Sequence, residues 1–223
     1  MSFQDNLKEI RKTIERVGKH RDVDVSTIRV VAVSKQQPEE RILEALESGY
    51  RLFAENRVND AAKIWGGEQG LKARYDGVEL HLIGHLQTNK VKEAVALFDM
   101  IETLDSVHLA EELAKEMEKQ VRRVPLLIQV NTGEEPQKSG IAPKDLDAFV
   151  ATCRKLDLPV QGLMCLPPED EPAGLHFTFL KELSERVNLP KLSMGMSGDF
   201  EKAVPFKPDY VRIGSALFGA RKV

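Results

Sequence analysis

Cysteine and tryptophan are scarce in this chain of 223 residues, which contains two cysteines and one tryptophan. Cys153 and Cys165 are too few for a disulfide framework, and their spacing matches no metal-binding motif. No apolar run approaches the roughly 18–20 residues that a membrane-spanning helix requires. The polar start of the chain also lacks the apolar core of a secretory signal peptide. We therefore expect a cytoplasmic protein with reduced thiols, with Cys165 buried in the core rather than acting as a nucleophile.

The chain also lacks a strong excess of charge of one sign. Its formal net charge is −3, and acidic and basic residues are interspersed along the sequence. A basic stripe that would bind nucleic acid is therefore not expected. Low-complexity linkers are missing as well, so we expect residues 1–223 to form one domain.

Short β-branched runs alternate with longer amphipathic stretches, which is typical of α/β proteins with a parallel sheet. Leucine, isoleucine and valine at helical spacing predict an opening helix over residues 3–20. The alternation then predicts a single (β/α)8 TIM barrel that follows this extra N-terminal helix, although 223 residues is near the lower limit for such a barrel. An open doubly wound sheet is the main alternative, but no G-x-G-x-x-G follows the first strand. The predicted strands are residues 28–35, 52–56, 78–84, 100–104, 124–130, 160–166, 191–196 and 210–213.

Lys35 stands at the end of the first predicted strand, where TIM barrels place their functional groups. A lysine amine in the mouth of a barrel can condense with an aldehyde. By position alone, a solvated lysine at a strand end is the simpler interpretation. His81 and His85 suggest a metal pair, but four residues along a strand span about 13 Å, so we expect no metal site there.

The ends of strands seven and eight carry small and hydroxylated residues just before helical segments. Ser197 and Gly198 follow strand seven, and Gly214 and Ser215 follow strand eight. Hydroxyls and helix N-termini bind phosphate oxygens, and barrels commonly build a phosphate site from these two loops. The alternative is that Ser197, Ser215 or Asp199 only caps a helix. Because two such loops face a lysine on strand one, we favour a phosphate site.

Two further strand-end residues complete the candidate site. Arg212 carries a permanent positive charge and can face a pyridine nitrogen, which would keep that nitrogen unprotonated. Its alternative role is a surface ion pair. Asn56 has an amide that can contact a polar ring substituent, although asparagine at a strand end is also common in turns.

Several segments, in this order and spacing, resemble the pyridoxal phosphate homeostasis proteins, which are relatives of the barrel domain of bacterial alanine racemase. The resemblance covers nearly the whole chain. Two departures are mild: Ser215 stands where the family often has threonine, and Gly198 replaces a bulkier polar residue. The segments are Ala32–Lys35, Phe53–Asn56, His81–Gln87, Lys138–Gly140, Gly162–Met164, Ser193–Ser197 and Val211–Gly219.

The resemblance implies that pyridoxal 5′-phosphate (PLP) is held on Lys35 as a Schiff base. It further implies that Ser197, Gly198, Gly214 and Ser215 bind the phosphate, with Arg212 near the pyridine nitrogen and Asn56 beside the cofactor. The list of expected cofactor-binding residues is therefore Lys35, Asn56, Ser197, Gly198, Arg212, Gly214 and Ser215, with no catalytic residue and no metal.

The function that this implies is carrying or buffering PLP in vitamin B6 homeostasis, without turnover. Racemases of this fold append a second domain that supplies an opposing acid/base, and we expect none after Arg221–Val223. The three tyrosines are expected away from the barrel mouth. We expect a monomer whose ligand is the small-molecule cofactor, with transient contact to PLP-dependent enzymes and no nucleic-acid or membrane partner. A minimal PLP-dependent racemase or a Schiff-base aldolase stays open as the alternative.

Overall fold

The strands of this computed structural model, which describes residues 2–219, close into a parallel barrel in sequence order. β1 pairs with both β2 and β8, so no strand edge is left open. The expected (β/α)8 barrel is therefore confirmed. The strands are β1 (Arg29–Val33), β2 (Leu52–Glu55), β3 (Glu79–Leu82), β4 (Met100–Leu104), β5 (Leu126–Val130), β6 (Val160–Cys165), β7 (Lys191–Met196) and β8 (Tyr210–Ile213).

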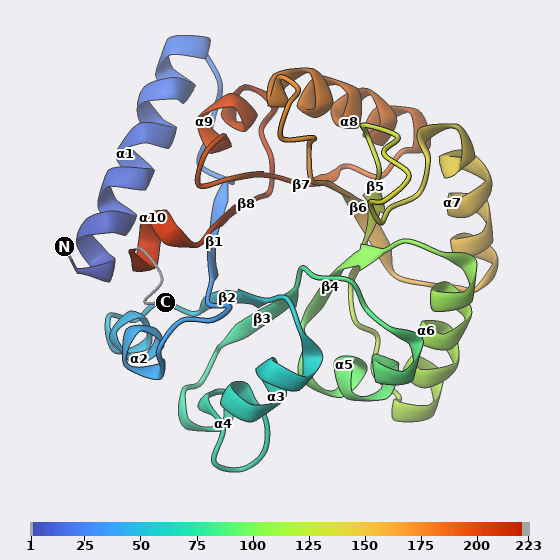
Figure 1. The fold of residues 1–223 in the computed structure, drawn as a ribbon, viewed down its shortest axis with the longest axis horizontal. Helices are drawn as coiled ribbons and strands as arrows, with labels where there is room; N and C mark the ends of the chain where they lie inside the picture. Colours follow the sequence, from blue (N-terminus) through green and yellow to red (C-terminus); the bar gives the residue numbers. More distant parts are fainter. Residues whose placement is uncertain (1, 220–223) are drawn as a thin grey trace.

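Helices surround the barrel and cover the outer faces of its strands (Figure 1). The sequence did not predict α4, which contains too few residues to show a helical period. The helices are α1 (Phe3–Arg21), α2 (Glu39–Glu47), α3 (Val58–Trp65), α4 (Leu71–Arg74), α5 (Val91–Leu97), α6 (Val107–Gln120), α7 (Leu146–Lys155), α8 (Ala173–Val187), α9 (Phe200–Ala203) and α10 (Ser215–Phe218), with 3-10 segments η1 (Thr88–Lys90), η2 (Pro143–Asp145) and η3 (Val204–Phe206).

Side chains alternate between two apolar layers along each strand, as the two-residue period of a strand requires. On β1, Ala32 faces the layer between barrel and helices, whereas Val31 and Val33 face the barrel interior. Cys165 belongs to the outer layer and is fully buried, as expected.

The first predicted strand was too long at its C-terminal end. β1 stops at Val33, since the N–H of Gln37 donates to the Ser34 carbonyl and Gln36 adopts a φ of 57°. Lys35 therefore lies in a tight turn just beyond the strand rather than on it. In the same way, β2 ends before Asn56 and β3 ends at Leu82.

The N-terminal helix α1 packs against α10, the segment that follows β8 (Figure 1). Ser2 and Asp5 form a reciprocal capping box that starts α1. The side-chain amide of Asn6 donates to the Leu217 carbonyl at 2.7 Å, and the rings of Phe3 and Phe218 lie 5.3 Å apart. These contacts hold the C-terminal end of α10 against α1. The predicted closing helix extended to Ala220, which lies outside the described residues, as do Arg221–Val223.

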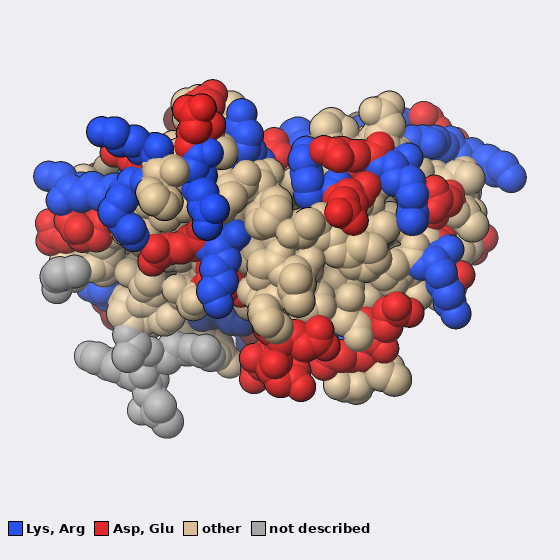
Figure 2. All heavy atoms as spheres, turned by 90° about the horizontal axis from the view of Figure 1, so that it is seen from above, with Lys and Arg blue, Asp and Glu red and all other residues tan. Residues whose placement is uncertain are grey.

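Charges of both signs are interspersed over much of the face in Figure 2, and acidic residues gather along its lower edge. This face presents no extended basic stripe. None of the helices between residues 2 and 219 combines the length and the hydrophobicity of a membrane span.

Candidate functional site

A pocket of about 430 Å³ opens at the C-terminal ends of the strands. This volume lies in the range of small-molecule sites, roughly 300–1,000 Å³. All seven residues predicted to bind the cofactor line it, although they come from four different strand ends. The lining comprises Val33, Lys35, Gln37, Asn56, Ile83, Lys138, Leu166, Pro167, Glu169, Met196, Ser197, Gly198, Arg212, Gly214 and Ser215.

Lys35 lies in a turn whose preceding residue, Ser34, is held by buried hydrogen bonds. The hydroxyl of Ser34 donates to the buried carboxyl of Glu55 at 2.5 Å, and the indole N–H of Trp65 donates to the same carboxyl at 3.3 Å. Burial raises the pKa of Glu55, although these two hydrogen bonds and the charge of Lys35 oppose the rise. The ends of β1 and β2 are thus tied to α3, which fixes the backbone that carries Lys35.

Asn56 lines the pocket, and its side-chain oxygen is a buried polar atom without a hydrogen-bond partner among the described residues. Its side-chain oxygen accepts no hydrogen bond from the described residues and is shielded from solvent. Such a group is costly to bury unless a ligand or water satisfies it. The backbone of Asn56 lies against Gly84, where an added Cβ would sit 2.1 Å from the Asn56 carbonyl oxygen, so only glycine fits there.

The loop after β7 reaches across to the start of α10. The Ser197 hydroxyl accepts the N–H groups of Gly214 at 3.3 Å and of Ala216 at 3.5 Å. The Asp199 carboxylate instead accepts the Met196 N–H at 2.6 Å, and neither α9 nor α10 has a side-chain cap of its own. The capping alternative therefore holds only in part, because Ser197 satisfies donors of a helix other than the one it precedes.

The packing of the protein does not require glycine at Gly198 or Gly214. A Cβ added at Gly198 would meet no protein atom within 4 Å, and one at Gly214 would come no closer than 3.6 Å to any. Neither residue has a positive φ. Glycines in such positions allow a ligand to approach the backbone closely.

Arg212 does not form the surface ion pair that was its alternative role. Its side chain is buried, and its guanidinium donates to the Ser193 hydroxyl at 2.6 Å and to the Cys165 carbonyl at 2.8 Å. The Glu102 carboxylate lies 3.9 Å away. A fixed cation therefore forms part of the pocket wall.

Lys138 also lines the pocket, although it is not among the residues predicted to bind the cofactor. The segment after β5 folds back over the mouth, since Ile141 forms a parallel bridge with Val130 and Gly140 adopts a φ of 122°. The Lys138 ammonium forms a 2.6 Å ion pair with Glu135. Its Lys-Ser-Gly segment was part of the resemblance, but no local pattern reveals that the loop returns to the mouth.

The two histidines of β3 and its following loop do not share a metal ion. His81 lies inside the barrel between Glu79 and Glu102, whereas the half-exposed His85 pairs with Asp105 at 3.1 Å. Over the described part of the chain, no group of three His, Cys, Asp or Glu residues could hold a metal.

The tyrosines lie away from the pocket, as expected. The Tyr50 hydroxyl donates to the Val30 carbonyl, and burial raises the pKa of Tyr50 to about 12. Tyr75 stacks with Arg51, and Tyr210 packs against the His81 ring at the opposite end of β8. The pocket lining contains no tyrosine.

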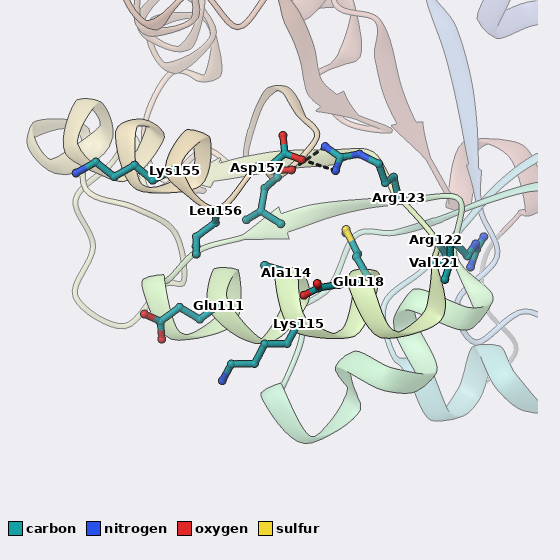
Figure 3. Close-up of a pocket in the computed structure, with 12 residues that line it drawn as sticks. Glu111, Ala114, Lys115, Glu118, Val121, Arg122, Arg123, Lys155, Leu156 and Asp157 are labelled. Atoms are coloured by element: carbon teal, nitrogen blue, oxygen red, sulfur yellow. Dashed lines mark hydrogen bonds and ion pairs between the residues drawn. The ribbon is translucent and has the colours of Figure 1, made fainter.

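A larger hollow of about 1,020 Å³ lies on the outer surface, between α6 and the connection from α7 to β6 (Figure 3). The side chains of Lys115 and Lys155 extend away from it, and an ion pair of 2.7 Å joins Arg123 to Asp157 beside it. Because it is near the N-terminal ends of β5 and β6, it is separate from the strand-end residues. Its greater size does not make it the functional site.

Comparison with known proteins agrees with the geometry of the mouth. The family described as alanine racemase, N-terminal domain, matches residues 4–222. A pyridoxal phosphate homeostasis protein of Vibrio cholerae is 36% identical, over 99% of this chain and 97% of its own. The structure of PipY from Synechococcus elongatus with PLP bound is 34% identical, with a TM-score of 0.75, and covers 93% of this chain and 100% of its own. Alanine racemase from Bartonella henselae is 18% identical and shares the fold, with a TM-score of 0.72 over 99% of this chain and 60% of its own.

Proposed function

Since the chain belongs to the alanine racemase N-terminal domain family and, within it, to the pyridoxal phosphate homeostasis proteins, we propose that it binds PLP at the barrel mouth and carries or buffers it in vitamin B6 homeostasis. The observation that carries the proposal is the convergence of an amine, a cation and two hydroxyl-bearing loops in one pocket. The PLP-bound PipY structure supports the same cofactor.

In this proposal Lys35 holds PLP covalently, as a Schiff base between its amine and the cofactor's aldehyde. When bound, PLP supplies an electrophilic carbon that captures primary amines. Ser197 and Ser215 offer hydroxyls to the phosphate, and Gly198 offers its backbone N–H. The N–H of Gly214 is donated to Ser197, and the missing side chain at Gly214 leaves room for the phosphate to approach the backbone. The fixed backbone around Lys35 keeps the amine at the strand end facing these loops.

The residues present also fit the ring of the cofactor. The buried Asn56 oxygen, which lacks a partner among the described residues, can accept a hydrogen bond from a ring hydroxyl. Arg212 uses two N–H donors for Ser193 and Cys165, and a guanidinium has five. We therefore assign the pyridine nitrogen to Arg212, which keeps that nitrogen unprotonated.

Binding without turnover is the second part of the proposal. Racemisation needs a base on each face of the cofactor, together with a ring that absorbs electrons. Lys35 serves one face, no tyrosine lines the pocket, and Arg212 weakens the electron sink. Lys138 is the amine that an enzymatic alternative would use for the other face. Incubation with alanine in deuterated water should give no rapid α-deuteration, and deuteration that Lys138→Ala removes would make this protein an enzyme.

Titration of the purified protein with PLP tests the binding directly. We expect visible absorption to develop, and we expect pyridoxal without its phosphate to bind more weakly because Ser197 and Ser215 then have no anion to contact. Equal affinity for PLP and for pyridoxal would show that these loops do not bind the phosphate. A sugar-phosphate aldolase, the remaining alternative, would stay colourless with its own substrates.

We further propose that residues 1–223 act as a single cytoplasmic domain and a monomer, which passes PLP to PLP-dependent enzymes by transient contact. The single closed barrel, in which every strand pairs with its sequence neighbour, supports the single domain. Light scattering of the PLP-loaded protein tests the monomer.

A further inference from the structure

Charged and polar side chains form a continuous chain inside the barrel, from its N-terminal end to the pocket. We call it the axial network, and each member contacts the next. Both terminal nitrogens of Arg29 donate to Glu79, at 2.6 and 3.2 Å, and Glu79 lies 2.9 Å from Nε2 of His81. Nδ1 of His81 lies 2.7 Å from Glu102. The axial network comprises Arg29, Glu79, His81, Glu102, Ser193 and Arg212.

The last links of the network end at the pocket wall. The Ser193 hydroxyl donates to the second oxygen of Glu102 at 2.5 Å and accepts from the Arg212 guanidinium at 2.6 Å. His81, Glu102 and Ser193 are inaccessible to solvent, while Arg212 is 2% exposed and lines the pocket. Through Ser193, therefore, both Glu102 and His81 are connected to a residue at the mouth.

The contacts between the buried members of the network favour their charged forms. Burial alone would lower the pKa of His81, but its contacts with Glu102 and Glu79 outweigh burial and raise that pKa. Burial would raise the pKa of Glu102, yet His81 and Arg212 bring it below its usual value. Basic and acidic side chains therefore alternate along the network. Tyr210 also packs against His81, with 5.0 Å between the two ring centroids in an edge-to-face arrangement.

Stability alone does not explain this arrangement. TIM barrels commonly fill their interior with layers of apolar side chains, and Val31, Leu127 and Met164 do so here. Replacing a buried ion pair by apolar residues of similar volume is often neutral or stabilising. A network of charges that reaches the pocket is better explained by its effect on the residue at its end.

The network can transmit charge and orientation to the pocket, but not a proton, because a guanidinium stays protonated. We propose that Glu102, held by His81, is a positioning residue that orients Arg212 and moderates its positive charge toward the ring nitrogen of PLP. This inference rests on the proposed function. It adds that the electronic state of the bound cofactor is set from inside the barrel, below the pocket.

Glu102→Gln tests the inference, since glutamine keeps the shape and removes the charge. The probes are PLP and its 1-deaza analogue, in which carbon replaces the ring nitrogen. We expect Glu102→Gln to weaken PLP binding by about tenfold, as for a perturbed charge-assisted hydrogen bond. We also expect it to shift the pH profile of the bound cofactor's absorption. The 1-deaza analogue should bind wild type and variant alike.

Ser184→Ala is the matched control. Ser184 lies on α8, outside the axial network. Its hydroxyl is also buried and donates to the Leu189 carbonyl at 2.6 Å. Its loss should leave both affinities and the spectrum as in wild type. If Glu102→Gln does not fold, Ser193→Ala removes the bridge to Arg212 and should show the same selectivity for PLP over the analogue.

Two results would overturn the inference: unchanged PLP affinity and spectrum in the folded variant, or an equal loss for PLP and its analogue. Failure of the proposed function gives a different result, since wild-type protein would then develop no visible absorption with PLP.

Discussion

The two halves of the barrel interior are built from the same strands but satisfy their polar groups differently. Toward the N-terminal end, both ring nitrogens of His81 and both carboxylate oxygens of Glu102 have partners within 3 Å. At the mouth, the buried oxygen of Asn56 has none among residues 2–219. Polar groups that pair with one another hold the barrel together, whereas an unpaired one at a pocket wall points to a ligand. Arg212 belongs to both halves.

The largest effect expected is at the mouth, from Lys35→Ala. The variant should lose covalent retention of PLP completely and keep only a weak, phosphate-dependent affinity, because the phosphate loops remain. Visible absorption after gel filtration measures the retention. Lys138→Ala should stay coloured, since Lys138 is paired with Glu135. A Lys35→Ala protein that stays coloured would show that another amine, Lys138 in the loop after β5, holds PLP.

Truncation of one buried group in each half tests the comparison itself. Glu102→Ala leaves the Arg212 guanidinium buried without its anion and leaves His81 with Glu79 alone, so it should lower the free energy of unfolding by roughly 3–5 kcal/mol. Asn56→Ala removes a side-chain oxygen that has no hydrogen-bond partner among residues 2–219, so it should cost far less stability in the absence of PLP. Urea unfolding of both variants, compared with wild type, gives the values. Equal losses would show that the two halves do not differ in this way.

The phosphate loops should give a smaller effect, confined to binding. Ser197→Ala and Ser215→Ala should each weaken PLP affinity by roughly 1–3 kcal/mol, the contribution of a hydrogen bond to a charged group. Pyridoxal without its phosphate is the control ligand, and its affinity should not change. A matching loss for pyridoxal would indicate a general disturbance of the mouth.

The smallest effect concerns acid stability at the N-terminal end. The hydrogen bond to His81, opposed by burial and assisted by Arg29, lowers the pKa of Glu79 to about 2. Because this pKa is lower in the folded protein than in the unfolded chain, where it is about 4.3, ionised Glu79 stabilises the fold at pH values above about 4.3. This contribution is lost as the pH falls toward 2. Glu79 is partly exposed, so the contribution is on the order of 1 kcal/mol. Urea midpoints between pH about 5 and about 3 should fall less steeply in Glu79→Gln, whereas parallel curves would exclude this contribution.

Much of the fold could be predicted because it depends on local patterns. Two-residue alternation in the strands and helical spacing between them suffice for a barrel, and the rule that sites lie at strand ends then brings Lys35, Ser197 and Ser215 together. The turn that ends β1 early depends on the positive φ of Gln36, which no residue preference at that position reveals.

The rest depends on contacts between distant strands. Arg212 was placed correctly at the end of β8, but its burial requires Ser193 on β7 and the Cys165 carbonyl on β6. Sequence spacing also related His81 to His85, whereas the partner of His81 is Glu102 on the next strand. Lys138 reaches the mouth only because its loop bridges back to β5.

Reduction of the wild-type protein with borohydride in the presence of PLP, followed by digestion and mass spectrometry, tests the central claim most directly. The reduction fixes the cofactor to whichever amine holds it. We predict a single phosphopyridoxyl group on the peptide that contains Lys35. Label on Lys138 in place of Lys35, or no label on the barrel mouth, would contradict the account.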